Sequence, residues 1–244
     1  MKVILIFLLF ALAILSSAYA EEAVITFTFD DGSETIFRNA FPLFAKYKFP
    51  ATLYLVTNCI GNGQWCVDWN QIAVMKNYDW EIASHSHTHP HMTELAEEQI
   101  EEELDKSIDV LKKHGYEARS YASPYGEFDE RVLNLVKKRF QNHRKSWGGV
   151  NGFNDSSHLN RYDISAIELR HSMSFEEVKG LIDKAVEERR WLVFLLHGIV
   201  KDAPQEYQFS KKILEDVLKY IKNLKIKVVT ISDYLENQRK GEEE

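Results

Sequence analysis

Four of the nine histidines stand at every second position of one short stretch, as His85, His87, His89 and His91. Neutral imidazole is the commonest protein ligand for zinc and similar metals. A second stretch supplies an acidic partner, because Asp30 and Asp31 directly follow an apolar run and precede Gly32. Two adjacent carboxylates beside a buried strand are costly unless a cation lies between them. Together the two stretches predict a metal centre.

The expected ligand set is two histidines and one carboxylate, which keeps positions open for water and substrate. Here the candidates are Asp31 and two of the four histidines. If the strand continued, all four rings would lie on one face, whereas a helical turn would place His85 and His89 together and turn His87 away. Spacing alone leaves the pair open. The remaining rings, His87 and His91 above all, are interpreted as surface residues.

Another histidine, His197, directly follows the most apolar of the predicted strands, 191–196. Two alternatives without chemistry stay open at this point. The aspartates Asp30 and Asp31 would cap the helix that follows them, and His197 would be a hydrogen-bonded histidine of the core. These structural roles can be told apart from a catalytic role only by whether the aspartates and His197 lie close together in the folded protein.

Strands and helices alternate along the chain. Runs rich in β-branched and aromatic residues predict strands over 24–29, 51–57, 80–83, 120–123, 191–196 and 226–231. Apolar residues at helical spacing predict helices over 35–47, 69–76, 94–114, 129–140, 174–190 and 209–224. We expect Thr93 and Ser174 to cap two of these helices and the tail from Glu236 to be frayed.

This alternation is typical of one α/β domain with a mostly parallel sheet. In a parallel barrel the carboxyl ends of the strands form one rim, where catalytic groups gather. The polar residues described above all follow predicted strands, so we expect them to converge. We therefore predict a distorted, incomplete (β/α) barrel over residues 21–244.

The first residues, 1–20, predict a secretory signal. Lys2 precedes an apolar run of about 13 residues, shorter than the roughly 20 of a membrane span. Ala18-Tyr19-Ala20 then forms a cleavage pattern. We expect cleavage after Ala20 and no stable membrane insertion afterwards, with an uncleaved anchor as the alternative. In either case the folded part would work outside the cytoplasm, secreted or associated with the cell envelope.

The overall composition excludes one class of partner. The formal net charge is −7 and the isoelectric point about 5.8. Nucleic-acid binding needs a basic face, so we expect no nucleic-acid partner. An apolar fraction of 45% is ordinary for a globular protein and is enough for a sizeable core.

Two cysteines, Cys59 and Cys66, lie close together in a loop that contains glycine and asparagine. Their spacing is not a usual zinc-binding spacing, and two sulfurs alone do not make a structural metal site. In an exported protein such a pair is expected to form a local disulfide. Free thiols are the alternative.

Taken in order, these stretches resemble the motifs of the polysaccharide deacetylase family (NodB homology, carbohydrate esterase family 4). The resemblance covers nearly the whole chain after residue 20. The matching segments, in chain order, are Thr28-Phe29-Asp30-Asp31, His85-Ser86-His87-Thr88-His89-Pro90, Ser123-Pro124-Tyr125-Gly126 and Leu195-Leu196-His197. Four ordered motifs at predicted strand ends make a specific signal, although none of them alone would.

The resemblance implies which residues would hold the metal. Asp31, His85 and His89 match the ligands of the family's centre. Zinc is the default for two histidines and one aspartate, and cobalt or nickel could substitute for it by ligand type.

The resemblance also implies the catalytic roles. Asp30 would be the general base toward the attacking water, and His197 the general acid toward the leaving amine. Tyr125 would help to hold the oxyanion through its backbone N–H. Leu196 would line the pocket for the acetyl methyl group.

The sequence departs from the family pattern in two places. The third motif usually begins with an arginine that pairs with the catalytic aspartate, and this chain has Ala122 there. The fourth motif, an Asp-x-x-Asp-Trp run whose aspartate tunes the catalytic histidine, is not recognisable around Trp147. We hypothesise that Arg144 or Arg161 replaces the missing arginine, since both follow or lie in predicted strands.

The predicted function is an exported, metal-dependent deacetylase. It would hydrolyse the N-acetyl group of N-acetylhexosamine units in a chitin-like or cell-envelope glycan. Trp147, Tyr125 and Trp191 are candidate faces for stacking on sugar rings, and Trp191 would suit the core equally well. One alternative is an O-acetyl esterase on xylan, because the same centre hydrolyses esters. Another is a non-catalytic glycan-binding protein, although Asp30 and His197 are retained and neither is needed to bind a metal.

Overall fold

The computed structural model describes residues 22–63, 65–146 and 152–243. The signal segment predicted over 1–20 and the residue Trp147 therefore lie outside the described residues. Within the described part of the chain, no helix combines the length and the apolar character that crossing a membrane requires.

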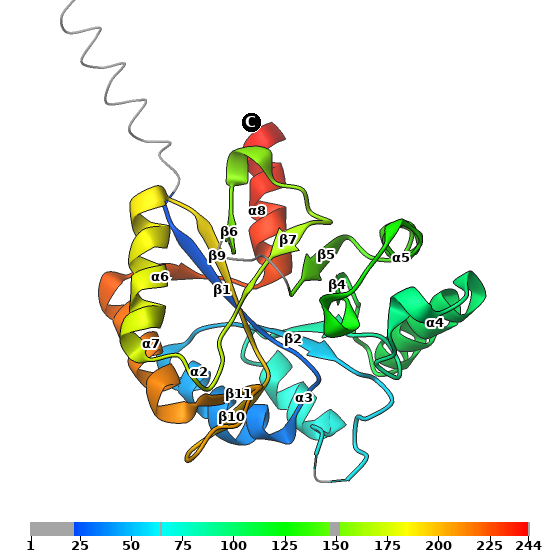
Figure 1. The fold of residues 1–244 in the computed structure, drawn as a ribbon, viewed down its shortest axis with the longest axis horizontal. Helices are drawn as coiled ribbons and strands as arrows, with labels where there is room; N and C mark the ends of the chain where they lie inside the picture. The colour runs from blue at the N-terminus through cyan, green and yellow to red at the C-terminus, as the bar shows by residue number, and fades with distance from the viewer. Residues whose placement is uncertain (1–21, 64, 147–151, 244) are drawn as a thin grey trace, which may run out of the picture.

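A mostly parallel sheet forms the centre of the molecule (Figure 1). The strands are β1 (Val24–Phe29), β2 (Thr52–Leu55), β3 (Glu81–Ser84), β4 (Ser120–Ala122), β5 (Asn142–Lys145), β6 (Phe153–Asn154), β7 (Ile164–Ser165), β8 (Ile167–Glu168), β9 (Trp191–Leu196), β10 (Gly198–Val200), β11 (Gln208–Ser210) and β12 (Lys227–Val228). The main order is β6-β9-β1-β2-β3-β4-β5-β7, with β12 beside β1 and β8 beside β9. β6 runs antiparallel to β9, and β10 and β11 form a separate parallel pair.

The sheet curves into a barrel whose seam is bridged by a side chain. β6 and β7 are the two ends of the strand order. The amide of Asn154 on β6 donates to the carbonyl of Ser165 on β7 and accepts from its N–H, both at 2.9 Å. A peptide group of a neighbouring strand would make the same two bonds. The prediction of a distorted, incomplete (β/α) barrel is confirmed.

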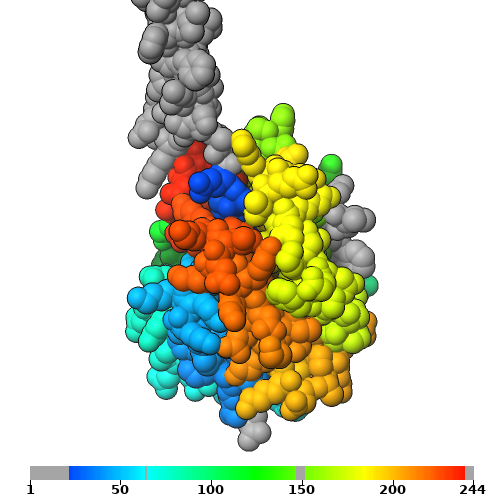
Figure 2. All heavy atoms as spheres, turned by 90° about the vertical axis from the view of Figure 1, so that its left-hand side faces the viewer, coloured from blue at the N-terminus to red at the C-terminus, as the bar shows by residue number. Residues whose placement is uncertain are grey.

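Helices cover the outside of the barrel. They are α2 (Phe41–Tyr47), α3 (Trp69–Lys76), α4 (Glu97–Lys113), α5 (Glu130–Lys137), α6 (Phe175–Glu188), α7 (Lys211–Leu224) and α8 (Ile231–Glu243), with a π-helical turn over Ile36–Ala40 and 3-10 turns over Met92–Glu94, Pro124–Gly126 and Ser156–His158. Figure 2 shows α2, α6 and α7 side by side on one flank of the molecule. α4 and α5 lie on the opposite flank in Figure 1.

The outer face of β1 is aromatic. Because successive side chains of a strand point to opposite faces, Phe27 and Phe29 both enter the core under the helices. The ring of Phe27 lies 5.2 Å from that of Phe44 on α2 and 5.3 Å from that of Phe194 on β9. Phe29 stacks on Trp80 at 5.2 Å. These contacts fix β1, and with it the residues that follow it.

The inner face of the strands is unusual for a barrel. Barrel interiors are ordinarily filled by branched apolar side chains. Here Tyr54, Ala83 and Ala122 form a small buried cluster. The guanidinium of Arg144 lies over the ring of Tyr54, 4.9 Å from its centre. The small alanines leave room for this long charged side chain.

The charged helix α4 begins later than predicted. Its cap is Ala96, whose N–H donates to the side chain of Gln99 at 3.0 Å. The prediction that Thr93 caps this helix is wrong, because the chain there forms a 3-10 turn closed by a bond from the N–H of Glu94 to the carbonyl of His91.

Two other helix predictions have opposite outcomes. Ser174 caps α6, as predicted, by accepting a hydrogen bond from the N–H of Glu177. The chain after Glu236 is not frayed, because α8 continues to Glu243. α8 is anchored by Tyr234, whose ring stacks on Trp191 at 3.8 Å.

Replacing Phe27 by alanine is expected to destabilise the fold by about 3–5 kcal/mol, because it leaves a cavity in a fully packed aromatic core. The free energy of unfolding is measured by urea denaturation. Leu224→Ala, at the exposed end of α7, serves as the control and is expected to change that energy by no more than about 0.5 kcal/mol. Equal effects of the two substitutions would contradict this description of the core.

Candidate functional site

The two aspartates separate because the chain turns sharply after β1. Asp30 continues the strand, and its N–H donates to the carbonyl of Leu196 at 2.9 Å. Asp31 and Gly32 then adopt φ angles of 69° and 77°, in the region that favours glycine. A methyl group at position 32 would lie 2.7 Å from Cδ2 of Leu55, so the leucine side chain would have to shift to admit a larger residue. Asp30 consequently points into the barrel and is buried, whereas Asp31 stays half-exposed.

A second left-handed turn breaks the alternation of the histidines. Ser86 and His89 have φ angles of 65° and 62°, and the N–H of His89 donates to the Ser86 hydroxyl at 2.9 Å. The carboxylate of Glu103 on α4 accepts the N–H of His87 at 3.0 Å and holds the loop. The chain thus leaves the strand direction after His85, which returns His89 to the same side.

Asp31, His85 and His89 offer ligand atoms that all lie within 4.8 Å of one another. Nε2 of His85 and Nε2 of His89 lie 3.6 and 3.5 Å from Oδ1 of Asp31. Nδ1 of His85 lies 2.8 Å from the carbonyl of Ala122. Because a carbonyl only accepts, this Nδ1 carries the proton and Nε2 keeps a free lone pair. The donor set fits a divalent metal such as zinc.

His89 has the protonation state that a metal ligand needs. Burial, together with the charge of neighbouring His85, lowers the pKa of His89 to about 4. The ring is therefore neutral at pH 7, and neutral imidazole is the form that binds metals.

The other two histidines of the stretch have different partners. Nδ1 of His87 lies 2.9 Å from the hydroxyl of Thr57. His91 lies with its Nδ1 3.0 Å from a carboxylate oxygen of Glu127, and its ring stacks on Tyr125 at 3.9 Å. Tyr125, whose backbone is left-handed at a φ of 56°, is thereby supported at the edge of the site.

Arg144 contacts Asp30 from the strand beside the predicted motif position. Ala122 on β4 pairs in register with Arg144 on β5. Nη2 of Arg144 donates to both carboxylate oxygens of Asp30, and the two side chains are only 0% and 4% exposed. Arg161 instead lines a surface pocket with Leu235. Of the two arginines considered from the sequence, the structure places Arg144 beside Asp30.

Arg144 outweighs the effect of burial on Asp30. Burial alone would raise the pKa of this carboxyl, but the charge of Arg144, assisted by His85 and His197, holds the pKa below its ordinary value. An ionised carboxylate is the form that a general base requires.

A carboxylate that the sequence analysis missed faces His197. Oε1 of Glu168 lies 3.3 Å from Nδ1 of His197, because β8 pairs with β9. Burial works to lower the pKa of His197, but the carboxylates of Glu168, Asp30 and Asp31 outweigh it and raise the pKa. Arg170 donates to the other oxygen of Glu168 at 2.7 Å. A weak signal existed, since polar and apolar residues alternate over 167–170.

The candidate metal ligands, Asp30, His197 and Glu168 line one cavity of about 300 Å³. Its apolar wall is Leu195, which corrects the prediction that Leu196 lines the site. Leu196 lies on the opposite face of β9 and packs in the outer core with Phe194. Trp191 is not a sugar-stacking face, because it is buried in the core against Tyr234.

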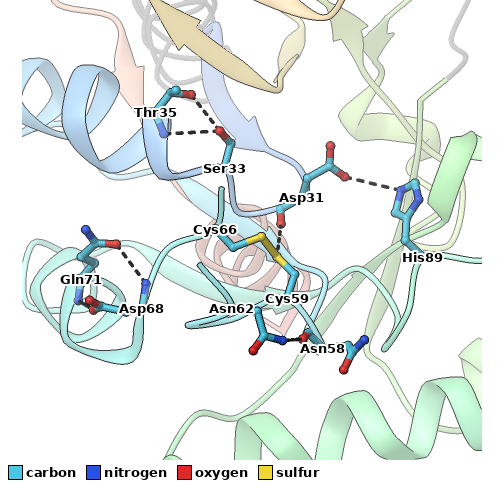
Figure 3. Close-up of a disulfide and its surroundings, with 10 residues drawn as sticks. All are labelled: Asp31, Ser33, Thr35, Asn58, Cys59, Asn62, Cys66, Asp68, Gln71 and His89. Carbon is cyan, nitrogen blue, oxygen red and sulfur yellow. Dashed lines mark hydrogen bonds and ion pairs between the residues drawn. A yellow bond between two sulfur atoms is a disulfide. The ribbon is translucent and has the colours of Figure 1, made fainter. Parts of the chain in front are cut away.

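A disulfide joins Cys59 and Cys66 directly beside the metal-ligand set (Figure 3). Sγ of Cys59 lies 3.8 Å from the carbonyl oxygen of Asp31. The N–H of Val67 donates to the carbonyl of Gly32 at 2.9 Å. The disulfide loop is therefore built onto the turn that carries the aspartates.

The barrel and its two-histidine, one-aspartate rim define a class of protein. Residues 18–139, half of the chain, match the sequence profile of the polysaccharide deacetylases, and the chain belongs to that family. A poly-beta-1,6-N-acetyl-D-glucosamine N-deacetylase of Staphylococcus aureus (strain MRSA252) is 30% identical over 124 residues. That match covers 45% of this chain and 43% of the relative, so this chain spans less than half of the relative's length.

Solved structures share the fold. The Xyl-CE4 domain of a multidomain xylanase from the hindgut metagenome of Trinervitermes trinervoides has a TM-score of 0.66 at 18% identity, over 89% of this chain and 91% of that domain. A CE4 family pseudoenzyme of Bacillus anthracis has a TM-score of 0.60 at 14% identity, over 88% of this chain and 66% of that one. The same barrel thus serves both an esterase-family domain and a protein described as a pseudoenzyme.

Arg144→Ala is expected to lower deacetylase activity at least about 100-fold, the scale of a lost general base. The reason is that Asp30 loses the charge that keeps it ionised. The free energy of unfolding should fall by about 3–5 kcal/mol, because a buried charge loses its partner. Acetate release and urea denaturation measure the two effects.

Arg161→Ala is the matched control and should leave both quantities unchanged. The double variant Ala122→Arg/Arg144→Ala returns a guanidinium to Asp30 from the neighbouring strand and should recover part of the activity. Full activity in Arg144→Ala would refute the assignment.

Glu168→Gln is expected to move the alkaline limb of the activity profile to lower pH, because the carboxylate that helps to raise the pKa of His197 is lost. If His197 is the general acid, it works only while protonated, and without the Glu168 carboxylate it loses its proton at lower pH. The measurement is kcat against pH. Glu176→Gln, on the exposed surface of α6, should leave the profile in place, and an unmoved limb in Glu168→Gln would count against the His197–Glu168 pair.

Proposed function

We propose that this protein hydrolyses the N-acetyl group of N-acetylhexosamine units in a polysaccharide, with the aid of a divalent metal. One observation carries the proposal. Asp30 and His197, which a metal site does not need, lie on neighbouring strand ends beside the ligand set, and each has its own charged partner. These partners favour an ionised Asp30 and a protonated His197, the pair of states that water attack on an amide requires.

A divalent metal held by Asp31, His85 and His89 would supply Lewis acidity, which polarises the acetyl carbonyl and acidifies water. Asp30 takes the proton of the attacking water. His197 donates a proton to the nitrogen as the carbon–nitrogen bond breaks. The products are acetate and a free amine on the sugar.

The remaining contacts orient the acetyl group. The backbone N–H of Tyr125 donates to the carbonyl oxygen as negative charge develops on it. Leu195 offers the apolar surface that receives the methyl group. The stacking of His91 on Tyr125 and the His91–Glu127 contact hold the tyrosine loop in place for this task.

Separate observations support the proposed substrate class and the proposed location. The S. aureus relative carries the name of an N-deacetylase of poly-beta-1,6-N-acetyl-D-glucosamine, so we place this chain's substrate among N-acetylated glycans. The predicted signal over 1–20 and the Cys59–Cys66 disulfide favour a site of action outside the cytoplasm.

The proposal is tested by acetate release from N-acetylglucosamine oligomers with β-1,4 and β-1,6 linkages and from acetylated xylan. Purified protein is assayed with zinc, after chelation and as Asp30→Ala. We expect release from a glucosamine-type oligomer that chelation abolishes and that Asp30→Ala lowers at least about 100-fold. Release from xylan alone would make the protein an O-acetyl esterase, and no release from any substrate would favour glycan binding without catalysis.

A further inference from the structure

An exposed tryptophan stands on the disulfide loop beside the site. Among the described residues, four aromatic side chains are classed as exposed, and Trp65 is the most exposed at 85%. Tyr125 and Tyr207 both line the catalytic cavity. Tyr78 follows α3 and precedes β3, so it lies at the opposite, amino-terminal end of the strands. Three of the four aromatic side chains thus belong to the face that carries the site.

The backbone of Trp65 is held in place at its own carbonyl and at the residue that follows it. The next residue, Cys66, forms the disulfide with Cys59 and a β-bridge with Ser33. The carbonyl of Trp65 accepts the N–H of Glu34 at 2.9 Å. A ring on an anchored backbone loses little conformational freedom when a ligand covers it, which is the property of aromatic anchors in binding sites.

Trp65 also lies at the same end of the barrel as the catalytic cavity. Three peptide units separate Asp31 from Glu34, so their Cα atoms are at most about 11 Å apart, and Glu34 is hydrogen-bonded to Trp65. Figure 3 shows the disulfide directly beside Asp31, and the carboxylate of Asp31 directed away from it toward His89. The loop therefore lies behind the turn that carries the aspartates, next to residues that line the cavity.

The surroundings of Trp65 suit a sugar. A pyranose ring has an apolar face of C–H groups and a rim of hydroxyls. The indole offers a large flat apolar surface, and the exposed Asn58 and Asn62 of the same loop carry amide groups that hydrogen-bond hydroxyls. A deacetylated unit adds an ammonium group, which an indole face attracts.

The geometry points to Trp65 as a binding platform for a sugar unit next to the one being deacetylated. This inference rests on the proposed function, since it takes the occupant to be the same glycan chain. Trp65 is a binding residue and not a catalytic one: it holds the polymer while Asp30 and His197 act on a neighbouring unit. It therefore contributes to the binding of long substrates and not to that of short ones.

The test compares Trp65→Ala and Trp65→Phe with the exposed-aromatic control Tyr78→Ala. For an N-acetylglucosamine hexasaccharide, Trp65→Ala is expected to raise KM about tenfold at unchanged kcat, the scale of one lost aromatic contact. Activity on the disaccharide should stay within about twofold of the unsubstituted protein. Trp65→Phe should keep most of the affinity, and Tyr78→Ala should behave as the unsubstituted protein on both substrates.

A binding measurement separates this inference from the proposed function. The affinity for a fully deacetylated glucosamine hexasaccharide, which the enzyme cannot turn over, is measured by calorimetry and should fall about tenfold in Trp65→Ala. Loss of this affinity in a protein that releases no acetate would refute the proposed function and keep the platform. An unchanged affinity, no measurable binding of the hexasaccharide, or an equal loss of activity on both oligomer lengths would overturn the platform.

Discussion

The buried ion pair between Asp30 and Arg144 is the constraint on which the site depends. A carboxylate in that position without a partner would take up a proton, and a guanidinium without one would be an uncompensated buried charge. The pair also dictates the packing, because Ala122 must stay small where Arg144 passes over the ring of Tyr54. The inner face of β2, β3 and β4 is therefore organised around a charge, while the outer face of β1 is organised around aromatic rings.

A second charged pair, Glu168 and His197, lies on the other side of the cavity and favours a protonated group instead of an ionised carboxylate. Glu168 favours a protonated His197, as Arg144 favours an ionised Asp30, and burial opposes both. The two partners reach the site from β5 and β8. The candidate metal ligands Asp31 and His89 stand instead on left-handed turns. Positions within strands are held by the sheet, so the groups that control proton affinity sit on the more rigid part of the scaffold.

The sequence allowed some parts to be predicted and not others, for physical reasons. The strands 24–29 and 191–196 were predicted to the residue because both are rich in β-branched and aromatic residues, and 191–196 is apolar throughout. The same property hid which of Leu195 and Leu196 faces the cavity, since a strand buried on both faces has no alternation. The choice between Arg144 and Arg161 depended on the register of β4 and β5, which no local pattern encodes. Glu168 stands on a two-residue strand, and the alternation over 167–170 is too brief to distinguish a strand from a loop.

The bridge made by Asn154 closes the barrel where no strand ladder does. Elsewhere around the ring, neighbouring strands are paired through peptide groups, from one paired position between β3 and β4 to six between β1 and β9. Between β6 and β7 the two bonds of one amide side chain take that role. The chain itself supports the same seam, because β8 follows β7 after a single residue and pairs with β9. One side chain and one residue of backbone thus complete a ring whose other members are joined strand to strand.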